Sequence, residues 1–346
     1  VFFTGGYTVR ATIDQEMQVH AARALRRQLE KYDRGRGVWR GTGIRLEEPA
    51  LASEATWREA LGQTDVPRDI TLGGDWLPAV VLQVGEKFLG VGIEGVEAGG
   101  SVPRSDIKWM KGSFADNFTR GDVVLVRAVE KDGALSHWSL RQVPEVQGGF
   151  VAMDVNSGRV ISMQGGFSYQ HSGFNRATQA QRQPGSSFKP FVYAAALDSG
   201  YSPATIVVDA PIEIDTPQGL WRPRNSSNKF YGPTPLRTGI EMSRNLMTIR
   251  LAQEVGMPVV AGYAERFGVY DNMGTYLANS LGAEETTLYK MVAAYAMFAN
   301  GGQRVQPTLV DRIQDRFGKT IYRHDDRDCV DCAVASLEPG RAPRIV

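Results

Sequence analysis

The 346-residue sequence has only two cysteines, a net charge near zero and no long apolar run. No segment approaches the roughly 18 consecutive apolar residues that a membrane-spanning helix needs, so the sequence predicts no such helix. A net charge of +1 provides no bulk field to recruit nucleic acid or an acidic membrane. Hydrophobic residues at 42% and charged residues at 22% are typical of an ordinary soluble globular protein.

An initiator methionine and a secretion signal are also missing. Residues Val1–Gly6 lack both the charged flank and the apolar stretch of a signal peptide. We therefore expect the sequence to be a fragment, with any membrane anchor outside it. The basic stretch Arg34–Gly37 is short, and we interpret it as a solvated loop and not as a nucleic-acid-binding segment.

The two cysteines, Cys329 and Cys332, lie in a polar, charged stretch near the end of the sequence. A structural zinc site would need two more Cys or His ligands, and only His324 is close. A thioredoxin-type redox site would open a helix in a βαβ unit, which this stretch does not resemble. We interpret the pair as part of a short surface loop, which a disulfide would close in an oxidising compartment.

The pattern of apolar residues changes near residue 66 and again near residue 147. Residues 7–13 alternate as a strand does, and residues 14–32 repeat apolar side chains at a spacing of four, as an amphipathic helix does. From 66 to 146, short apolar runs separated by glycines predict a small all-β domain. We therefore predict a linker at 1–65, the all-β domain at 66–146 and a third domain at 147–346.

The strands and helices expected from local patterns define an α+β fold class. Strands are expected at residues 77–84, 88–93, 123–129, 150–155, 159–163, 310–314 and 319–323. Helices are expected at about 186–198, 241–254, 258–267 and 286–300. In the third domain strands come first, helices follow and strands return, with no repeating βαβ units, which favours α+β.

The segment Gln183–Pro190, which reads Gln-Pro-Gly-Ser-Ser-Phe-Lys-Pro, carries a candidate nucleophile. A proline is tolerated in a helix only within the first turn, so Pro190 predicts a helix that begins close to Ser186. Ser186 is then expected at the positive end of the helix dipole, where amide groups lack internal partners. Lys189 follows three residues later and is expected on the same face, about one turn away.

A serine hydroxyl needs a base to react at neutral pH. Lysine serves only in its neutral form, so its ordinary pKa of about 10.4 must fall by several units. Desolvation and neighbouring positive charge both lower the pKa of a lysine. A lysine on a buried first turn, facing a helix N-terminus, meets both conditions, so we predict Ser186 as nucleophile and Lys189 as its base.

The pattern Ser-x-x-Lys is weak by itself. It also occurs at Ser105–Lys108, in the predicted all-β region, and at Ser226–Lys229, where no helix aligns the two side chains. Ser186 differs from both because Pro-Gly precedes it and an apolar helix follows it.

A second candidate, Ser243-Arg244-Asn245, lies near the start of another predicted helix. A hydroxyl at such a helix entry can relay a proton to a leaving amine, and an amide can hold a peptide group. The alternative interpretation is an ordinary N-cap.

Together these segments resemble the class A high-molecular-weight penicillin-binding proteins. Ser186–Lys189 is similar to their Ser-x-x-Lys motif, and Ser243–Asn245 to their second motif, in which a Ser and an Asn flank one residue. Residues 7–14 are similar to the linker after the family's glycosyltransferase domain, and the 66–146 region to an OB-like domain. The likeness also extends over residues 221–225, 230–233, 237, 280–282 and 294–302.

The resemblance implies a β-lactamase-like transpeptidase fold, with mixed helices around an antiparallel sheet, plus a small OB-like domain. It implies a serine D,D-transpeptidase that cross-links peptidoglycan stem peptides ending in D-Ala-D-Ala and that β-lactam antibiotics acylate. No metal or organic cofactor is expected. The implied residues are Ser186, Lys189, Ser243 and Asn245 for catalysis, and Ser187, Trp221 and Asn225 for substrate binding.

The resemblance also implies partners and a location. An amine of a neighbouring stem peptide would accept the acyl group, and partner proteins of cell-wall synthesis are expected, but no nucleic acid. The protein would work at the periplasmic face of the bacterial inner membrane. The full-length parent would also carry a peptidoglycan glycosyltransferase.

The sequence departs from the family in one motif. The third motif, Lys-Thr-Gly on a strand beside the nucleophile, is absent. Lys319-Thr320-Ile321 lies at a predicted hairpin turn, and Ile321 would place a side chain where glycine lets the substrate backbone pair. We therefore expect a chain truncated before that strand. It would lack one oxyanion donor, a loss that costs about 10²–10³ in rate.

Two other functions remain open. A D,D-carboxypeptidase or β-lactamase would pass the acyl group to water, although the linker and the OB-like region argue against such a compact enzyme. A non-catalytic β-lactam sensor or scaffold would keep the fold without cross-linking. Turnover of penicillin would favour the first alternative, and stable acylation without cross-linking would favour the second.

Overall fold

The computed structural model describes residues 5–216 and 219–325. These residues form two compact units. The first, here called the helix unit, comprises the described residues within 1–14, 152–162 and 181–346. The second, here called the sheet unit, comprises residues 15–151 and 163–180. Cys329 and Cys332 lie outside the described residues.

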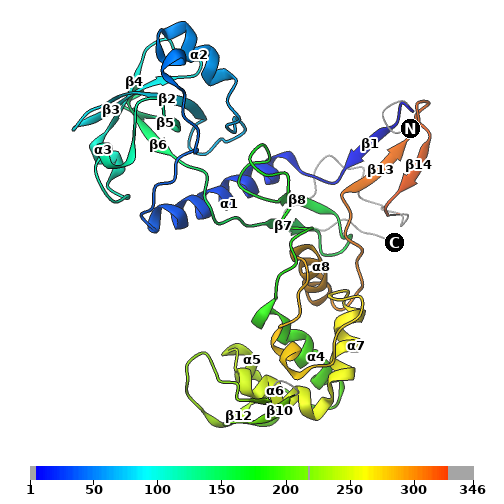
Figure 1. Ribbon diagram of the computed structural model, residues 1–346. Helices are drawn as coiled ribbons and strands as arrows, with labels where there is room; N and C mark the ends of the chain where they lie inside the picture. The colour runs from blue at the N-terminus through cyan, green and yellow to red at the C-terminus, as the bar shows by residue number, and fades with distance from the viewer. Residues whose placement is uncertain (1–4, 217–218, 326–346) are drawn as a thin grey trace. The chain divides into compact units, whose positions relative to one another are not determined.

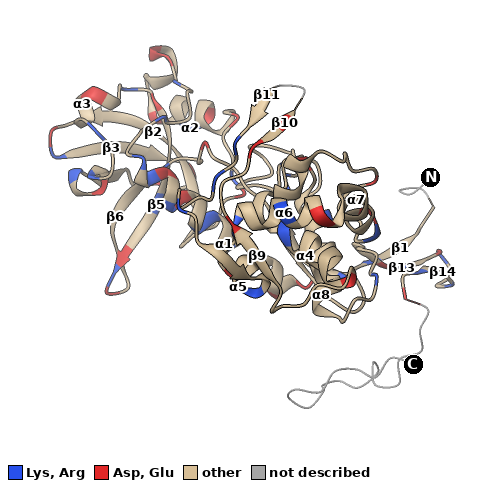
Figure 2. Cartoon of the chain, turned by 90° about the horizontal axis from the view of Figure 1, so that it is seen from below, with Lys and Arg blue, Asp and Glu red and all other residues tan. Residues whose placement is uncertain are grey.

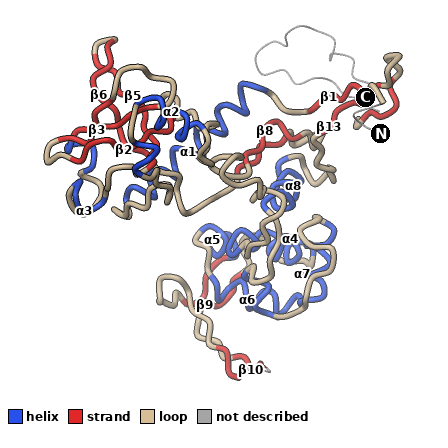
Figure 3. Tube along the Cα trace, turned by 45° about the horizontal axis from the view of Figure 1, so that its top comes forward, coloured by secondary structure: helices blue, strands red, loops and turns tan. Residues whose placement is uncertain are grey.

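The sheet unit is built on a five-stranded antiparallel sheet with strand order β4-β3-β2-β5-β6 (Figure 1). Figure 3 shows these strands as the main concentration of β structure in the molecule. The strands are β2 (Trp76–Val84), β3 (Phe88–Ile93), β4 (Gly100–Pro103), β5 (Val123–Lys131) and β6 (Ala134–Arg141). The helical segments of the unit are α1 (Gln15–Gly35), η1 (Glu48–Leu51), α2 (Glu54–Gly62), η2 (Arg104–Ile107) and α3 (Phe114–Asn117).

Both faces of this sheet are buried. Successive side chains of a strand point to opposite faces, and β5 follows this rule. Val124 and Val126 join one apolar cluster, whereas Val123 and Leu125 join another. Burial on both faces explains why the strands appear in the sequence as apolar runs. The predicted strands at 77–84, 88–93 and 123–129 are confirmed. The sequence missed β4, which is short and contains Gly and Pro, and β6, in which polar and apolar residues are mixed.

The helix unit packs five helices around one apolar core. They are α4 (Lys189–Asp198), α5 (Leu236–Glu241), α6 (Asn245–Val255), α7 (Met257–Arg266) and α8 (Leu288–Ala299). The 3₁₀ segments η3 (Gly185–Phe188) and η4 (Leu277–Leu281) complete the helical part. Most of α4 is buried, and Phe188, Phe191 and Val192 have no exposed surface. The core therefore surrounds the helix that follows Ser186.

The strands of the helix unit form small antiparallel sheets. β1 (Thr8–Ala11) pairs with β13 (Val310–Gln314), which pairs with β14 (Thr320–Arg323). β9 (Ile206–Asp209) pairs with β12 (Gly232–Pro235), and β10 (Ile214–Thr216) pairs with β11 (Gly219–Trp221). The hairpin of β7 (Phe150–Met153) and β8 (Val160–Gln164), of which residues 152–153 and 160–162 belong to this unit, forms a separate two-stranded sheet. Both predicted hairpins are confirmed.

Four helices were predicted in this region, and one of them is corrected. Three of the four are confirmed within a few residues, but the helix expected at 241–254 is broken. α5 ends at Glu241, and α6 begins only at Asn245. Ser243 between them has a φ of +52°, and a left-handed residue cannot continue a right-handed helix.

The distribution of charged residues and the hydropathy of the helices agree with the sequence composition. Lys and Arg are interspersed with Asp and Glu along the chain (Figure 2). Among the described helices, none has the length and hydropathy that a membrane span requires.

Candidate active site

Ser186 lies in the 3₁₀ turn that leads into α4. η3 covers Gly185–Phe188, α4 begins at Lys189, and Pro190 lies in its first turn. This confirms the predicted helix start. In a 3₁₀ turn, side chains three residues apart eclipse each other, so Ser186 and Lys189 leave the same face. The Ser186 side chain is exposed, and its hydroxyl has no hydrogen-bond partner among residues 5–216 and 219–325.

The Lys189 side chain is buried, with 1% exposure. Its Nζ donates to the Ser243 carbonyl oxygen at 2.6 Å, to Ser243 Oγ at 3.0 Å and to Asn245 Oδ1 at 2.6 Å. Burial lowers the pKa of Lys189 to about 8. The three hydrogen bonds match the three N–H donors of an ammonium group. Within the described chain, none of these hydrogen bonds goes to Ser186.

Ser243 owes its place beside Lys189 to its unusual backbone. A non-glycine residue at a φ of +52° is strained, and strain of this kind costs about 1–3 kcal/mol. The tight turn between α5 and α6 is held by Arg244 N–H, which donates to the Gly239 carbonyl oxygen at 2.8 Å. As a result, both oxygen atoms of Ser243 reach the same amine.

Asn245 is the first residue of α6, and its amide is fully oriented. Its Oδ1 accepts from Lys189, while its Nδ2 donates to the Arg224 carbonyl oxygen at 2.9 Å. Its backbone N–H donates to Asn225 Oδ1 at 2.9 Å. The side-chain oxygen accepts and both nitrogens donate, so the acceptor oxygen is fixed toward Lys189.

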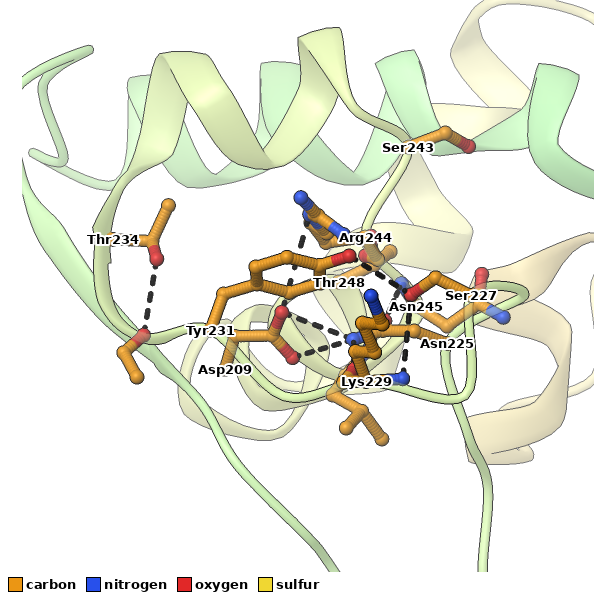
Figure 4. A network of polar contacts seen from close by, with 12 residues as sticks. Asp209, Asn225, Ser227, Lys229, Tyr231, Thr234, Ser243, Arg244, Asn245 and Thr248 are labelled. Carbon is orange, nitrogen blue, oxygen red and sulfur yellow. Dashed lines mark hydrogen bonds and ion pairs between the residues drawn. The ribbon is translucent and has the colours of Figure 1, made fainter.

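Asn225 and Asp209 form a buried polar pair beneath the start of α6 (Figure 4). Asn225 is 4% exposed and Asp209 is fully buried. Asn225 Nδ2 donates to both carboxylate oxygens of Asp209, at 2.8 and 3.0 Å, and to the Lys229 carbonyl oxygen at 2.9 Å. Arg244 Nε lies 4.0 Å from Asp209 Oδ2. A chain of contacts therefore runs from Asp209 through Asn225 and Asn245 to Lys189.

Sequence reasoning missed Asp209. It ends strand β9, and no motif or spacing connects it with Asn225 or Asn245. Its one local signal is an acidic residue directly after the apolar residues 206–208, which is too common to identify a site. A buried carboxylate needs partners, but only the tertiary structure shows which groups supply them.

Two predicted substrate-binding residues lie outside this contact chain. Trp221 belongs to β11 and lines a groove of about 720 Å³ together with Tyr276 and Asn279. The Ser187 hydroxyl donates to the carbonyl oxygen of Pro184. Asn225, predicted to bind substrate, has its amide engaged inside the protein. The structure thus brings Lys189, Ser243, Asn245 and Asn225 together, with Ser186 one turn before Lys189.

The other motif matches behave differently. Ser105 lies in η2 of the sheet unit, and Ser226–Lys229 forms part of a loop whose Lys229 carbonyl oxygen binds Asn225. Lys319 lies in the turn before β14, where its backbone N–H donates to Asp315 Oδ1 at 2.9 Å. Within the described residues, Lys108, Lys229 and Lys319 make no hydrogen bond to Ser243 or Asn245.

Comparison with known proteins defines the class. A family model described as the penicillin binding protein transpeptidase domain matches residues 148–331. A second model, the penicillin-binding protein OB-like domain, matches residues 39–146. The chain belongs to the penicillin-binding protein transpeptidase family and carries an OB-like domain before its transpeptidase domain. The resemblance and the α+β fold class predicted from the sequence are confirmed.

Individual relatives agree with this assignment. The chain is 39% identical to penicillin-binding protein 1A of Rickettsia bellii over 339 residues, which cover 96% of this chain and 41% of that protein. It is 36% identical to penicillin-binding protein 1A of Pseudomonas aeruginosa, covering 93% and 39%. A 2.6 Å crystal structure of penicillin-binding protein 1A from Haemophilus influenzae matches with a TM-score of 0.81 at 30% identity, covering 92% and 46%. The chain thus spans less than half the length of these relatives.

Proposed function

We propose that this chain carries the acylating site of a peptidoglycan D,D-transpeptidase, in which Ser186 is the nucleophile and Lys189 the base. The observation that carries the proposal is the buried Lys189 amine, with its pKa lowered to about 8 and Ser243 and Asn245 hydrogen-bonded to it. The family membership supports the same chemistry.

The chemistry of Lys189 supports a proton relay through Ser243. A neutral amine keeps two N–H donors and one lone pair. The Ser243 carbonyl oxygen and Asn245 Oδ1 can only accept, so they take the two N–H groups. Ser243 Oγ, at 3.0 Å, can reverse its role and donate to the lone pair. The same contact can therefore carry a proton in either direction.

The proposed reaction has two stages. Ser186 Oγ attacks the carbonyl carbon of the penultimate D-alanine of a donor stem peptide, and its proton passes to Lys189. The peptide bond breaks, and Lys189 and Ser243 return a proton to the departing D-alanine amine. An amine of a second stem peptide then attacks the acyl-enzyme ester, which forms the cross-link and regenerates the Ser186 hydroxyl. A β-lactam acylates Ser186 in the same way, and its opened ring stays attached.

The helix start supplies an electrostatic contribution. The Ser186 backbone N–H lies at the beginning of η3, where helical amides lack internal acceptors. It is our proposed donor to the oxyanion that develops on the attacked carbonyl, because such donors stabilise negative charge in the transition state. The reaction would take place on the periplasmic side of the inner membrane, where peptidoglycan is assembled.

The test is labelling of the full-length gene product with a fluorescent penicillin. Ser186→Ala is expected to abolish covalent labelling. Ser105→Ala is the matched control, since Ser105 is the exposed serine of another Ser-x-x-Lys match, in the sheet unit, and this variant is expected to keep the label. Retained labelling of the Ser186→Ala protein would overturn the assignment. Release of opened penicillin at a steady rate, in place of a stable adduct, would indicate a hydrolase.

A further inference from the structure

The backbone just before Ser186 is paired with a distant segment. Arg182 N–H donates to the Thr286 carbonyl oxygen at 2.9 Å, and Thr286 N–H donates back to Arg182 at 3.0 Å. Gly185 N–H donates to the Gly282 carbonyl oxygen at 3.1 Å. The position of the turn that carries Ser186 is therefore set by residues 282–286 as well as by its own helix.

Gly282 lies unusually close to Gly185. A Cβ placed on Gly282 would lie 2.6 Å from the Gly185 nitrogen and 2.9 Å from its carbonyl carbon, and closer still to its carbonyl oxygen. All three neighbours are backbone atoms of the residue next to Ser186. They cannot move aside without moving Ser186, so the contact requires glycine at position 282.

Helix capping does not account for this contact. Gly282 caps η4 with a φ of +72°, and a left-handed cap accepts glycine or asparagine. Gly268 follows α7 with the same φ of +72°, yet a Cβ placed there would meet nothing within 4 Å. The two glycines share one backbone conformation and differ in whether they touch the nucleophile turn.

The other side of the turn is held by a side chain. The Tyr295 hydroxyl on α8 donates to the Ser187 carbonyl oxygen at 2.7 Å. The Tyr295 ring packs edge-on against Phe191 of α4, at 5.9 Å between ring centroids. Burial raises the pKa of Tyr295, which keeps the hydroxyl protonated as a donor. Both neighbours of Ser186 in the sequence are thus fixed, while the Ser186 hydroxyl makes no hydrogen bond within the described residues.

We propose that Gly282 and Tyr295 are positioning residues for the nucleophile. Gly282 supports the turn through Gly185, and Tyr295 supports it through Ser187. This inference rests on the proposed function of Ser186. Because neither residue touches the reacting atoms, they act on the rate of the acylation step and not on the initial, non-covalent binding of the donor. A misplacement of a reacting group by about 1 Å can cost 10²-fold in rate.

The first experiment compares two substitutions at each of two glycines in the full-length gene product. Gly282→Ala and Gly282→Asn are measured beside Gly268→Ala and Gly268→Asn. The rate constant of penicillin acylation at saturation and the dissociation constant of the non-covalent complex are determined separately. Both Gly282 variants are expected to lose about 10²-fold in the rate constant, with a nearly unchanged dissociation constant. Both Gly268 variants are expected to react like the wild type.

Asparagine distinguishes the two explanations. If Gly282 served only as a cap, Gly282→Asn would acylate at the wild-type rate, because asparagine tolerates a positive φ. That result would overturn the role assigned to Gly282. A loss in the Gly268 variants equal to the loss in the Gly282 variants would also overturn it, because backbone strain alone would then be sufficient.

Tyr295→Phe supplies an independent test that leaves the core intact. It removes one hydroxyl and keeps the ring, and we expect the acylation rate constant to fall roughly 2- to 10-fold, with no change in the dissociation constant. An unchanged rate constant would overturn the role of Tyr295. If the Gly282 variants fail to fold, the Tyr295→Phe result alone decides the proposal. If wild-type protein is not labelled at Ser186, the proposed function fails; if it is labelled and all variants match it, only the positioning role fails.

Discussion

Lys189 carries a charge that its surroundings disfavour. The side chain is 1% exposed, and burial lowers its pKa from the ordinary value to about 8. Among the residues that the structure describes, its hydrogen-bond partners include no carboxylate. The absence of an acidic partner keeps the amine weakly basic, which is the property that a base near neutral pH needs.

The pH dependence of acylation follows from this pKa. Below pH 8 Lys189 is mainly protonated and has no lone pair, so the acylation rate constant should fall roughly tenfold per pH unit. Above pH 8 the amine is mainly neutral, and the rate constant should level off. Penicillin acylation measured from pH 6 to pH 10 checks this expectation. A rate constant that is flat across pH 8, or that falls as the pH rises, would contradict the role of Lys189 as base.

The strained backbone of Ser243 determines how this residue contacts Lys189. Its φ of +52° costs stability, but it turns both the carbonyl and the hydroxyl toward Lys189. Ser243→Gly and Ser243→Ala both remove the hydroxyl, whereas only glycine relaxes the backbone. We therefore expect the glycine variant to be more stable than the alanine variant by about 1 kcal/mol, as measured by chemical denaturation. Equal stability would mean that the turn is not strained at this position.

At the scale of elements, the start of α6 depends on groups from two other segments. Asn225, from the loop after β11, accepts from Asn245 N–H and, at 3.4 Å, from Leu246 N–H. These are amides of the first turn, which have no acceptor inside the helix. Asp209 at the end of β9 fixes Asn225 in turn. The second motif is therefore aligned by side chains that do not belong to it.

Asn225→Ala tests this arrangement. It leaves the Asp209 carboxylate without the Asn225 amide that donates to both of its oxygens, and the first amides of α6 without their acceptor. We expect a loss of about 3 kcal/mol in the free energy of unfolding and slower acylation. Ser226→Ala, at the exposed next position, is the control and should match the wild type in both respects. Full acylation activity in a destabilised Asn225→Ala protein would show that the pair serves stability alone.

At the scale of the whole molecule, each unit has its own apolar core. The sheet unit contains two clusters, one on each face of its sheet, and the helix unit contains one around α4. Leu51, Trp57 and Leu61 precede residue 66 but pack in the same cluster as residues of β2 and β5. The domain boundary expected at residue 66 stays a prediction, and the OB-like family match begins earlier, at residue 39.

Core substitutions in the two units should affect the reaction differently. Leu89 and Phe191 are fully buried, in the sheet unit and in the helix unit respectively. Leu89→Ala and Phe191→Ala should each cost about 2–5 kcal/mol of stability. Only Phe191→Ala, two residues after Lys189, should slow penicillin acylation. Thermal unfolding and acylation rates measured on both proteins check this, and equal losses of activity would contradict it.

The sequence alone determined the local part of this protein. Pro190 and the glycines at the ends of elements mark boundaries through their own backbone preferences, and apolar periodicity marks buried faces, so the helix start at Ser186 and both hairpins were predictable. The missed break at Ser243 has a physical reason as well: a serine carries no local signal for a positive φ.

Only the tertiary structure decided which distant groups surround the proposed nucleophile and base. Lys189 meets Asn245 across 56 positions of sequence, Asn245 meets Asn225 across 20, and Asn225 meets Asp209 across 16. Hydrogen bonds and close backbone contacts such as that of Gly282 with Gly185 depend on how helices pack, and no local preference encodes them. The residues that make a reaction conceivable are thus visible in the sequence, whereas those that hold them in place emerge only when the core closes around α4.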